Sequence, residues 1–458
     1  MTHLTTLTPA ELAPVTDRLS AANRDFLKRY PGESNRRQPV HVVYGGAHLF
    51  KAETASRLGM VSRKTLTQFA PDGPSLAKAL GVDWTPDFAD DLHARITAKL
   101  EREPVEDFRL DFEDGYGSRP DAEEDGHAIT SAGEVAAGLA AGTLPPFLGI
   151  RIKPFNEDTR TRSIRTMDLF LTTLLGLTGN KLPDNFVITL PKVQLAAHVA
   201  AADSICDLLE ANLKLPNGTL RLELMVETPQ SILDHNGISP LQSFIAAAQG
   251  RCGSVHFGVY DYTASYGITA ACQAMGHPAC DFARTVMTVA LAGTGVHLSD
   301  GATNILPVGP HRGDALTGKQ LADNAAAVHG AWKLAFNDNL HSLRQGLYEG
   351  WDLHPAQFIP RYAAVYSFFL SALPAATGRL KTFVQKAAQA SLFGDVFDDA
   401  ATGQGLLNFF LRGIACGAIT EAEALATGLT LEEIRTRSFQ KILEARAVDP
   451  RSAPVPGG

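Results

Sequence analysis

The sequence has few cysteines, no long apolar run and no excess of positive charge, and each absence excludes a class of protein. Five cysteines in 458 residues are an odd number, and none forms a Cys-x-x-Cys pair. This argues against a disulfide framework or a cysteine-rich zinc site and favours a reducing compartment. The N-terminus lacks the basic start and apolar run of a signal peptide, and no apolar stretch approaches about 18 residues. We therefore expect a cytoplasmic protein without a membrane span.

The charge balance and several missing motifs narrow the function further. With 41 basic and 49 acidic residues, the formal charge is −8, which gives no electrostatic footprint for nucleic acid. The chain contains no HExxH, GxSxG or GxxxxGK(S/T) motif. No GxGxxG sequence follows an early apolar run, which disfavours an open dinucleotide-binding sheet. Zinc-peptidase, serine-hydrolase and P-loop chemistry are therefore poor explanations of this sequence.

Short apolar runs alternate with longer segments that favour helices. We expect strands at 41–45, 108–113, 148–153, 186–191, 222–227 and 255–260, with weaker candidates at 296–298 and 350–354. Strands separated by helices pair in parallel because the crossover helices cover both faces of the sheet. Eight such units predict an α/β fold, a closed (β/α)8 TIM barrel, with an open doubly wound sheet as the alternative.

The two ends of the chain differ from this alternating pattern. Near the start, Thr8, Pro9 and Glu11 form a capping-box sequence that predicts a helix ending near Tyr30. After about residue 366 the alternation stops, and two further capping sequences begin at Thr420 and Thr430. We expect an N-terminal helical segment at 1–40, a catalytic barrel at 41–365 and a C-terminal helical extension at 366–458.

Carboxylates follow two strands that are neighbours in the predicted barrel. Glu227 ends the fifth strand and Asp261 follows the sixth, and barrel enzymes carry their active sites at these C-terminal strand ends. Two carboxylates with water and a substrate oxygen suit the octahedral oxygen shell of Mg²⁺. The alternative is that each acid caps a helix or forms a salt bridge.

A basic residue interrupts the apolar run LGIRIKP. Burying the guanidinium of Arg151 is costly unless it meets an anion, and its geometry matches a carboxylate. The alternative is an ion pair inside the barrel with Asp111 or Glu113. The acids Asp111, Glu113 and Asp114 could hold metal-bound water, orient Arg151 or form a solvated loop.

These strand ends resemble those of the citrate lyase β-subunit-like and HpcH/HpaI aldolase families. The similar segments lie between about residues 41 and 365, in the same order along the chain as in these families. From the N-terminal side they are GGAHLFKAETA, DFEDGYG, RIKPFN, LPKVQ, VETPQSI, FGVYDYTASYG, ARTVMTVALAGTGVHLSDG and GWDLHPAQFIP. The YDYTASY stretch also resembles malate synthases. The chain departs from short members of these families in its two terminal additions and in the longer separation of 34 positions from Glu227 to Asp261. The resemblance therefore does not decide whether there is a coenzyme A site.

The resemblance implies a set of functional residues. It implies that Glu227 and Asp261 hold the metal ion, Mg²⁺ with Mn²⁺ as the alternative. It implies catalytic roles for Arg151, Asp111, Glu113, Asp114 and Lys192. It implies contacts between the substrate and Arg151, Tyr260, Asp300 and His354.

The resemblance also implies a reaction class. We expect a metal-dependent carbon–carbon lyase or aldolase that acts through a metal-stabilised enolate on a small 2-oxo acid, hydroxy acid or acyl thioester. The alternatives are a malate-synthase-like condensation of an acyl-coenzyme A, phosphoenolpyruvate chemistry, and a metabolite-binding barrel without turnover. The expected partners are a small carboxylate, with coenzyme A thioester as a further candidate substrate, and a second copy of the chain, because such barrels commonly associate. Nucleic acid and membranes are not expected.

Overall fold

Eight parallel strands close into a barrel in the order of the sequence. The structure is a computed structural model that describes residues 6–32, 36–313, 315–385, 391–393, 396–398, 400–436 and 438–448. The strands are β1 (His41–Gly46), β2 (Asp107–Asp111), β3 (Phe147–Arg151), β4 (Phe186–Leu190), β5 (Arg221–Val226), β6 (Cys252–Phe257), β7 (His297–Ala302) and β8 (Glu349–Trp351). Pairing of His41 with Gly350 and of Val42 with Trp351 closes the sheet. The predicted barrel is confirmed.

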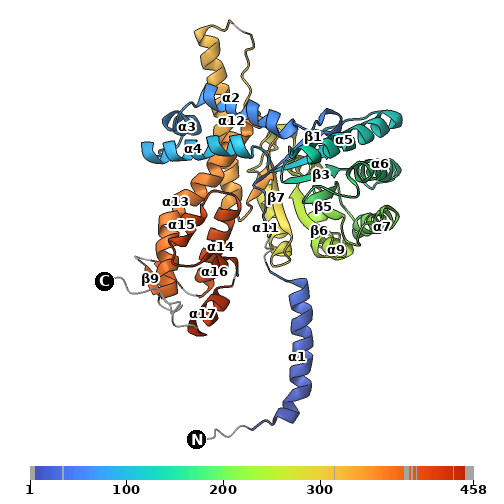
Figure 1. The fold of residues 1–458 in the computed structure, drawn as a ribbon, viewed down its shortest axis with the longest axis vertical. Coiled ribbons are helices and arrows are strands. Elements are labelled where there is room, and N and C mark those ends of the chain that lie inside the picture. The colour runs from blue at the N-terminus through green and yellow to red at the C-terminus, as the bar shows by residue number, and fades with distance from the viewer. Residues whose placement is uncertain are drawn as a thin grey trace.

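Helices connect the strands and surround the barrel (Figure 1). They are α2 (Thr54–Phe69), α3 (Gly73–Leu80), α4 (Pro86–Arg102), α5 (Asp121–Ala141), α6 (Arg160–Thr178), α7 (Ala196–Leu213), α8 (Pro229–Ile232), α9 (Leu241–Ala247), α10 (Val259–Ser265), α11 (Pro278–Leu291) and α12 (Gly318–Arg344). Three short 3-10 helices are η1 (Ala47–Leu49), η2 (Ala270–Cys272) and η3 (Pro355–Gln357). Within the described part of the chain, no helix has the length and apolar character to cross a membrane.

The hydrophobic core lies between the barrel wall and the surrounding helices. Side chains along a strand alternate between its two faces. In β2, Phe108 and Leu110 join the apolar cluster outside the barrel. The intervening Arg109 instead reaches Glu223 of β5, on the inside. Polar residues therefore fill much of the barrel interior, where branched apolar residues are the usual filling.

The first helix stands apart from the barrel. Helix α1 (Pro9–Arg29) begins with the predicted capping box, in which Thr8 and Glu11 exchange hydrogen bonds. None of its residues is buried, and the helix projects away from the body of the molecule (Figure 1). Its base is attached where the amide of Gly32 donates to the carbonyl of Gly293.

The C-terminal part is mainly helical, as expected. It contains α13 (Phe358–Gln385), α14 (Ala400–Ala415), α15 (Glu421–Leu425), α16 (Leu431–Arg435) and α17 (Phe439–Val448), with an antiparallel pair, β9 (Ser391–Phe393) and β10 (Val396–Asp398). The capping boxes of Thr420 and Thr430 are confirmed. The tail at 453–458 lies outside the described residues. A single helix, α13, runs across position 365, and the division into three parts stays a prediction.

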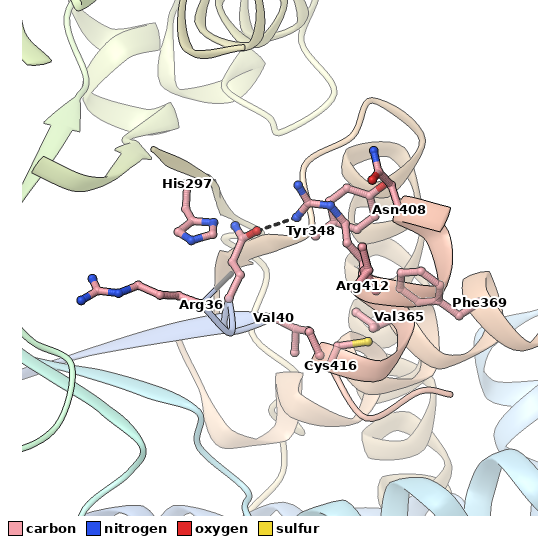
Figure 2. Close-up of a pocket in the computed structure, with 12 residues that line it drawn as sticks. Arg36, Val40, His297, Tyr348, Val365, Phe369, Asn408, Arg412 and Cys416 are labelled. Carbon is pink, nitrogen blue, oxygen red and sulfur yellow. Dashed lines mark hydrogen bonds between the residues drawn. The ribbon is translucent and has the colours of Figure 1, made fainter. Parts of the chain in front are cut away.

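The C-terminal helices contact the N-terminal end of the barrel. Arg412 of α14 donates to the Gln38 side chain across 2.8 Å and lies 4.3 Å from the ring centre of Tyr348. Gln38 and Tyr348 precede β1 and β8, so this contact is made at the start of the strands. A small cavity of about 40 Å³ lies between the two parts (Figure 2). The extension is thus anchored at the end of the barrel opposite the predicted site.

Candidate active site

The ends of β2 and β3 fix a buried arginine. Asp111 and Arg151 are paired in the sheet register, and Arg151 Nε donates to Asp111 Oδ1 at 2.7 Å while Nη2 donates to Oδ2. Asp111 also accepts the backbone N–H groups of Glu113 and Gly115, at 2.9 and 2.7 Å. Both carboxylate oxygens are therefore engaged, and Asp111 acts here as an orienting group. Of the two interpretations of Arg151, the ion pair with Asp111 is present.

The remaining edge of the Arg151 guanidinium faces other groups. Nη1 lies 3.1 Å from Glu113 Oε2 and 3.5 Å from the sulfur of Met225. The guanidinium also lies over the rings of Tyr44 and Trp351, at 4.8 and 5.5 Å from their centres. Burial by itself lowers the pKa of Arg151, but the Asp111 and Glu113 carboxylates together with Tyr44 raise it overall. Arg151 is thus a permanent, rigidly held cation.

Glu227 is a buried carboxyl directly after β5. Its side chain accepts the backbone N–H of Lys192 at 2.6 Å, and the residue is 1% exposed. Gly258, after β6, allows this position, because a Cβ there would lie 2.5 Å from both Cβ and Oε2 of Glu227. Burial raises the pKa of Glu227 to about 8; Lys192 opposes this, and Asp261 and Glu113 add to it.

Lys192 links the acids of this cluster. Its backbone is left-handed, with φ of 50°, and its ammonium group binds Glu113 and lies 3.3 Å from Asp114 and 3.4 Å from Asp261. Burial would lower the pKa of Lys192, but Glu227 and Glu113 raise it overall. The structure therefore brings the predicted acids at the ends of β2, β5 and β6 to one residue, Lys192. Its ammonium group meets Glu113, Asp114 and Asp261, and its backbone N–H meets Glu227.

The donor set fits a hard cation with few protein ligands. Within the described residues, no group of three or more His, Cys, Asp or Glu side chains is arranged to hold a metal. Mg²⁺ usually takes one or two carboxylates and keeps several waters. Glu227 directly follows β5 and Asp261 lies in α10 after the neighbouring β6. Burial raises the pKa of Glu227 and the charge of Asp261 adds to this, and a divalent cation would offset both effects.

Three predicted substrate contacts lie elsewhere. Asp300 binds Arg284 of α11 at 3.0 Å and Ser342 of α12, on the helix side of β7. The His354 imidazole accepts the N–H of Ala356 as the cap of η3, and burial lowers its pKa.

The third predicted contact, Tyr260, has its hydroxyl committed to the end of β7. It donates to the carbonyl of Ala302 at 2.8 Å and accepts the amide of Asn304 at 3.0 Å. Burial raises the pKa of Tyr260. The structure thus does not bring these hydroxyl, imidazole and carboxyl groups to Lys192, and their roles toward a substrate stay predictions.

A second polar group inside the barrel was not predicted. Arg109 donates to Glu223 at 2.6 and 3.0 Å, His256 lies 2.8 Å from Glu223, and Tyr44 joins Glu223 and His256 through its hydroxyl. The nearby Glu349 is buried, and burial raises its pKa well above the usual range. Tyr44 connects this layer to the site because its ring also contacts Arg151.

The signal for this interior layer was present in the sequence. Charged residues alternate in the segments DFRLD and RLELMV, and alternate residues share one face of a strand. The charged residues of each segment therefore share one face of their strand. That face lies either in the barrel interior or against the helices, and in both places the charges need partners.

Comparison with known proteins places the sequence in a family. Residues 19–442 match the family described as domain of unknown function DUF6986. The chain belongs to the DUF6986 family. No curated protein matches this DUF6986 chain.

Solved structures share the fold of the DUF6986 chain. A citrate lyase from Burkholderia xenovorans LB400 aligns with a TM-score of 0.55 at 17% identity, over 86% of this chain and 97% of that one. The Mycobacterium tuberculosis protein CitE, in complex with magnesium, acetoacetate and coenzyme A, gives 0.46 at 14% identity over 84% and 100%. A magnesium/glyoxylate complex of Haloferax volcanii malate synthase gives 0.45 at 13% identity over 88% and 99%. The expected superfamily resemblance is confirmed at the level of fold.

Proposed function

We propose that the protein is a Mg²⁺-dependent carbon–carbon lyase or aldolase acting through an enolate on a small 2-oxo acid, hydroxy acid or acyl thioester. The observation that carries this proposal is the position of two carboxylates, Glu227 and Asp261, around Lys192, which also binds Glu113 beside Arg151. This cluster lies at the C-terminal ends of the strands, where TIM-barrel enzymes carry their active sites.

The metal site would consist of Glu227 and Asp261. A divalent cation bound there would polarise a substrate oxygen and stabilise the negative charge that develops on it. Gly258 keeps the space that Glu227 occupies, and Lys192 fixes one Glu227 oxygen through its backbone N–H. These two contacts would fix the orientation of the Glu227 carboxylate.

Arg151 would bind the carboxylate of the substrate. Its Nε and Nη2 are held by Asp111, which leaves Nη1, beside Glu113, to donate to a ligand that takes the place of Glu113. A fixed guanidinium in a buried site stabilises developing negative charge without reorganisation. Binding of a substrate carboxylate would compete with Glu113 for this edge.

Glu113 and Lys192 would take part in proton transfer. Burial raises the pKa of Glu113, with Arg151 and Lys192 opposing, so the carboxyl can hold a proton when one of its cations binds substrate. Lys192 stays charged and neutralises whichever carboxylate is ionised. This pair thus provides a proton acceptor next to the guanidinium.

The test is a metal-dependent activity screen. Purified protein with Mg²⁺, Mn²⁺ or EDTA is incubated with 2-hydroxy acids, 2-oxo acids and their acyl thioesters, and release of pyruvate or acetyl product is measured. Activity should require the metal and be lost in Asp261→Asn, but not in Asp121→Asn, an exposed acid at the start of α5.

The opposite reaction direction is tested in parallel. Thiol release from acetyl-coenzyme A with glyoxylate would reveal a condensing enzyme instead. Absence of turnover in both assays, with Mg²⁺ binding unchanged by Asp261→Asn, would overturn the proposal.

A further inference from the structure

Helix α1 carries an exposed apolar stripe, in which the ring of Phe26 packs only on Tyr30 at the end of the same helix among the described ring contacts. Leu12, Val15, Leu19 and Phe26 are 38, 53, 58 and 61% exposed, and no residue of the helix is buried. The stability of a helix in a protein comes mainly from packing its apolar face. This face therefore calls for a partner outside the described chain.

The spacing of the stripe is that of a coiled coil. The side chains follow steps of three and four residues, with one small residue completing the series: Leu12, Val15, Leu19, Ala22 and Phe26. A repeat averaging about 3.5 residues per turn places one narrow seam against another helix. Pro14 falls outside this seam. The partner that fits is a helix with the same repeat.

The charges beside the seam select a second copy in antiparallel orientation. Arg18 and Asp25 precede Leu19 and Phe26 by one residue and occupy equivalent flanking positions of the repeat. In an antiparallel pair these equivalent positions face each other, so Arg18 of each copy meets Asp25 of the other. A parallel pair would instead place Arg29 against Arg29, both in the seam.

The charged groups are available for such contacts. Among the described residues, the ion pair that Asp25 forms is with Lys28 at 3.8 Å, and both side chains are about 80% exposed. Exposed pairs of this kind contribute little. Helix α1 extends about 31 Å from the barrel (Figure 1), so antiparallel pairing keeps the two barrels at opposite ends of the helix pair.

We propose that α1 pairs with α1 of a second copy as an antiparallel two-helix coiled coil, which joins two chains through their N-terminal helices. The seam from Leu12 to Phe26 is only about two heptads long, so the dimer is weak and depends on protein and salt concentration. This inference rests on α1 alone and is independent of the proposed reaction.

Sedimentation equilibrium over a wide concentration range tests the proposal. The wild type is expected to dimerise, and Arg18→Asp should weaken the dimer at least about tenfold, because both flanking pairs become repulsive. Arg18→Asp combined with Asp25→Arg restores opposite charges and should recover the wild-type affinity. Arg24→Asp makes the same charge change away from the seam and should have little effect.

Two results would overturn the inference. One is a wild-type chain that stays monomeric at all concentrations. The other is a dimer whose affinity does not respond to Arg18→Asp, or whose loss in that variant is not recovered by the double exchange. Because no residue of α1 is buried, the variants should melt like the wild type, and circular dichroism melts check that each one is folded.

Discussion

Replacing Gly258 by alanine tests the geometry of the metal site through one contact. The glycine has φ of −90°, which alanine adopts without strain, so the substitution changes only the space beside it. The added Cβ would lie 2.5 Å from Cβ and Oε2 of Glu227, where ordinary contact begins at 3.4 Å. Because Glu227 Cβ is anchored to the backbone, the chain segments that carry Gly258 and Glu227 must move apart, and the carboxyl group shifts with them by nearly 1 Å.

A displacement of this size has a predictable effect. Misplacing a catalytic group by about 1 Å can reduce activity by about 100-fold. We expect Gly258→Ala to reduce kcat/KM for the identified substrate by about that factor and to weaken Mg²⁺ binding measured by isothermal titration calorimetry. The stability loss should be about 1–3 kcal/mol, as for other overpacked positions.

The matched control is Gly253→Ala in β6, the strand that Gly258 directly follows. A Cβ at Gly253 would meet nothing within 4 Å, so this variant should retain activity and metal binding. If Gly258→Ala and Gly253→Ala bind Mg²⁺ and turn over substrate alike, Glu227 does not serve as the ligand.

Two further substitutions probe ion pairs. Arg151→Lys cannot reach both oxygens of Asp111, so kcat/KM should fall by about 100-fold in steady-state kinetics; unchanged kinetics would remove Arg151 from the site. Burial alone would raise the pKa of Glu103, but Arg37 and Lys99 lower it from 4.5 to about 2. The stabilisation that ionised Glu103 gives to the folded state is complete above pH 4.5 and is lost as the pH falls towards 2. Glu103→Gln should therefore lower the free energy of unfolding by about 3 kcal/mol near pH 7 and by almost nothing near pH 2. Urea unfolding across this range checks the prediction, and a cost independent of pH would contradict it.

The alternation of strands and helices was sufficient to predict the barrel, but not every strand limit. The seventh strand was expected at 296–298 and extends over His297–Ala302, because its later residues are polar or glycine. Asp300 there turns outward to Arg284. The eighth was expected at 350–354 and ends at Trp351, because His354 instead caps the following turn.

The sequence predicted which residues form the candidate site better than it predicted which of them contact each other. Sequence alone left open whether Arg151 meets a ligand, Asp111 or Glu113, because the answer depends on the register of β2 and β3, which places Asp111 beside Arg151. The role of Lys192 as the link between Glu113 and Asp261 depends on a left-handed backbone that its sequence neighbours do not require. Long-range pairing decides both.

In the proposed reaction, Glu227 and Asp261 together hold one divalent cation. The most direct measurement is calorimetric titration of Mg²⁺ into the metal-free wild type and into Glu227→Gln, Asp261→Asn and the control Asp121→Asn. We predict one bound ion per chain in the wild type and in the control, and loss of binding in the other two variants. A wild type that binds no Mg²⁺, or Glu227→Gln and Asp261→Asn variants that bind it as tightly as the wild type, would rule out this metal site.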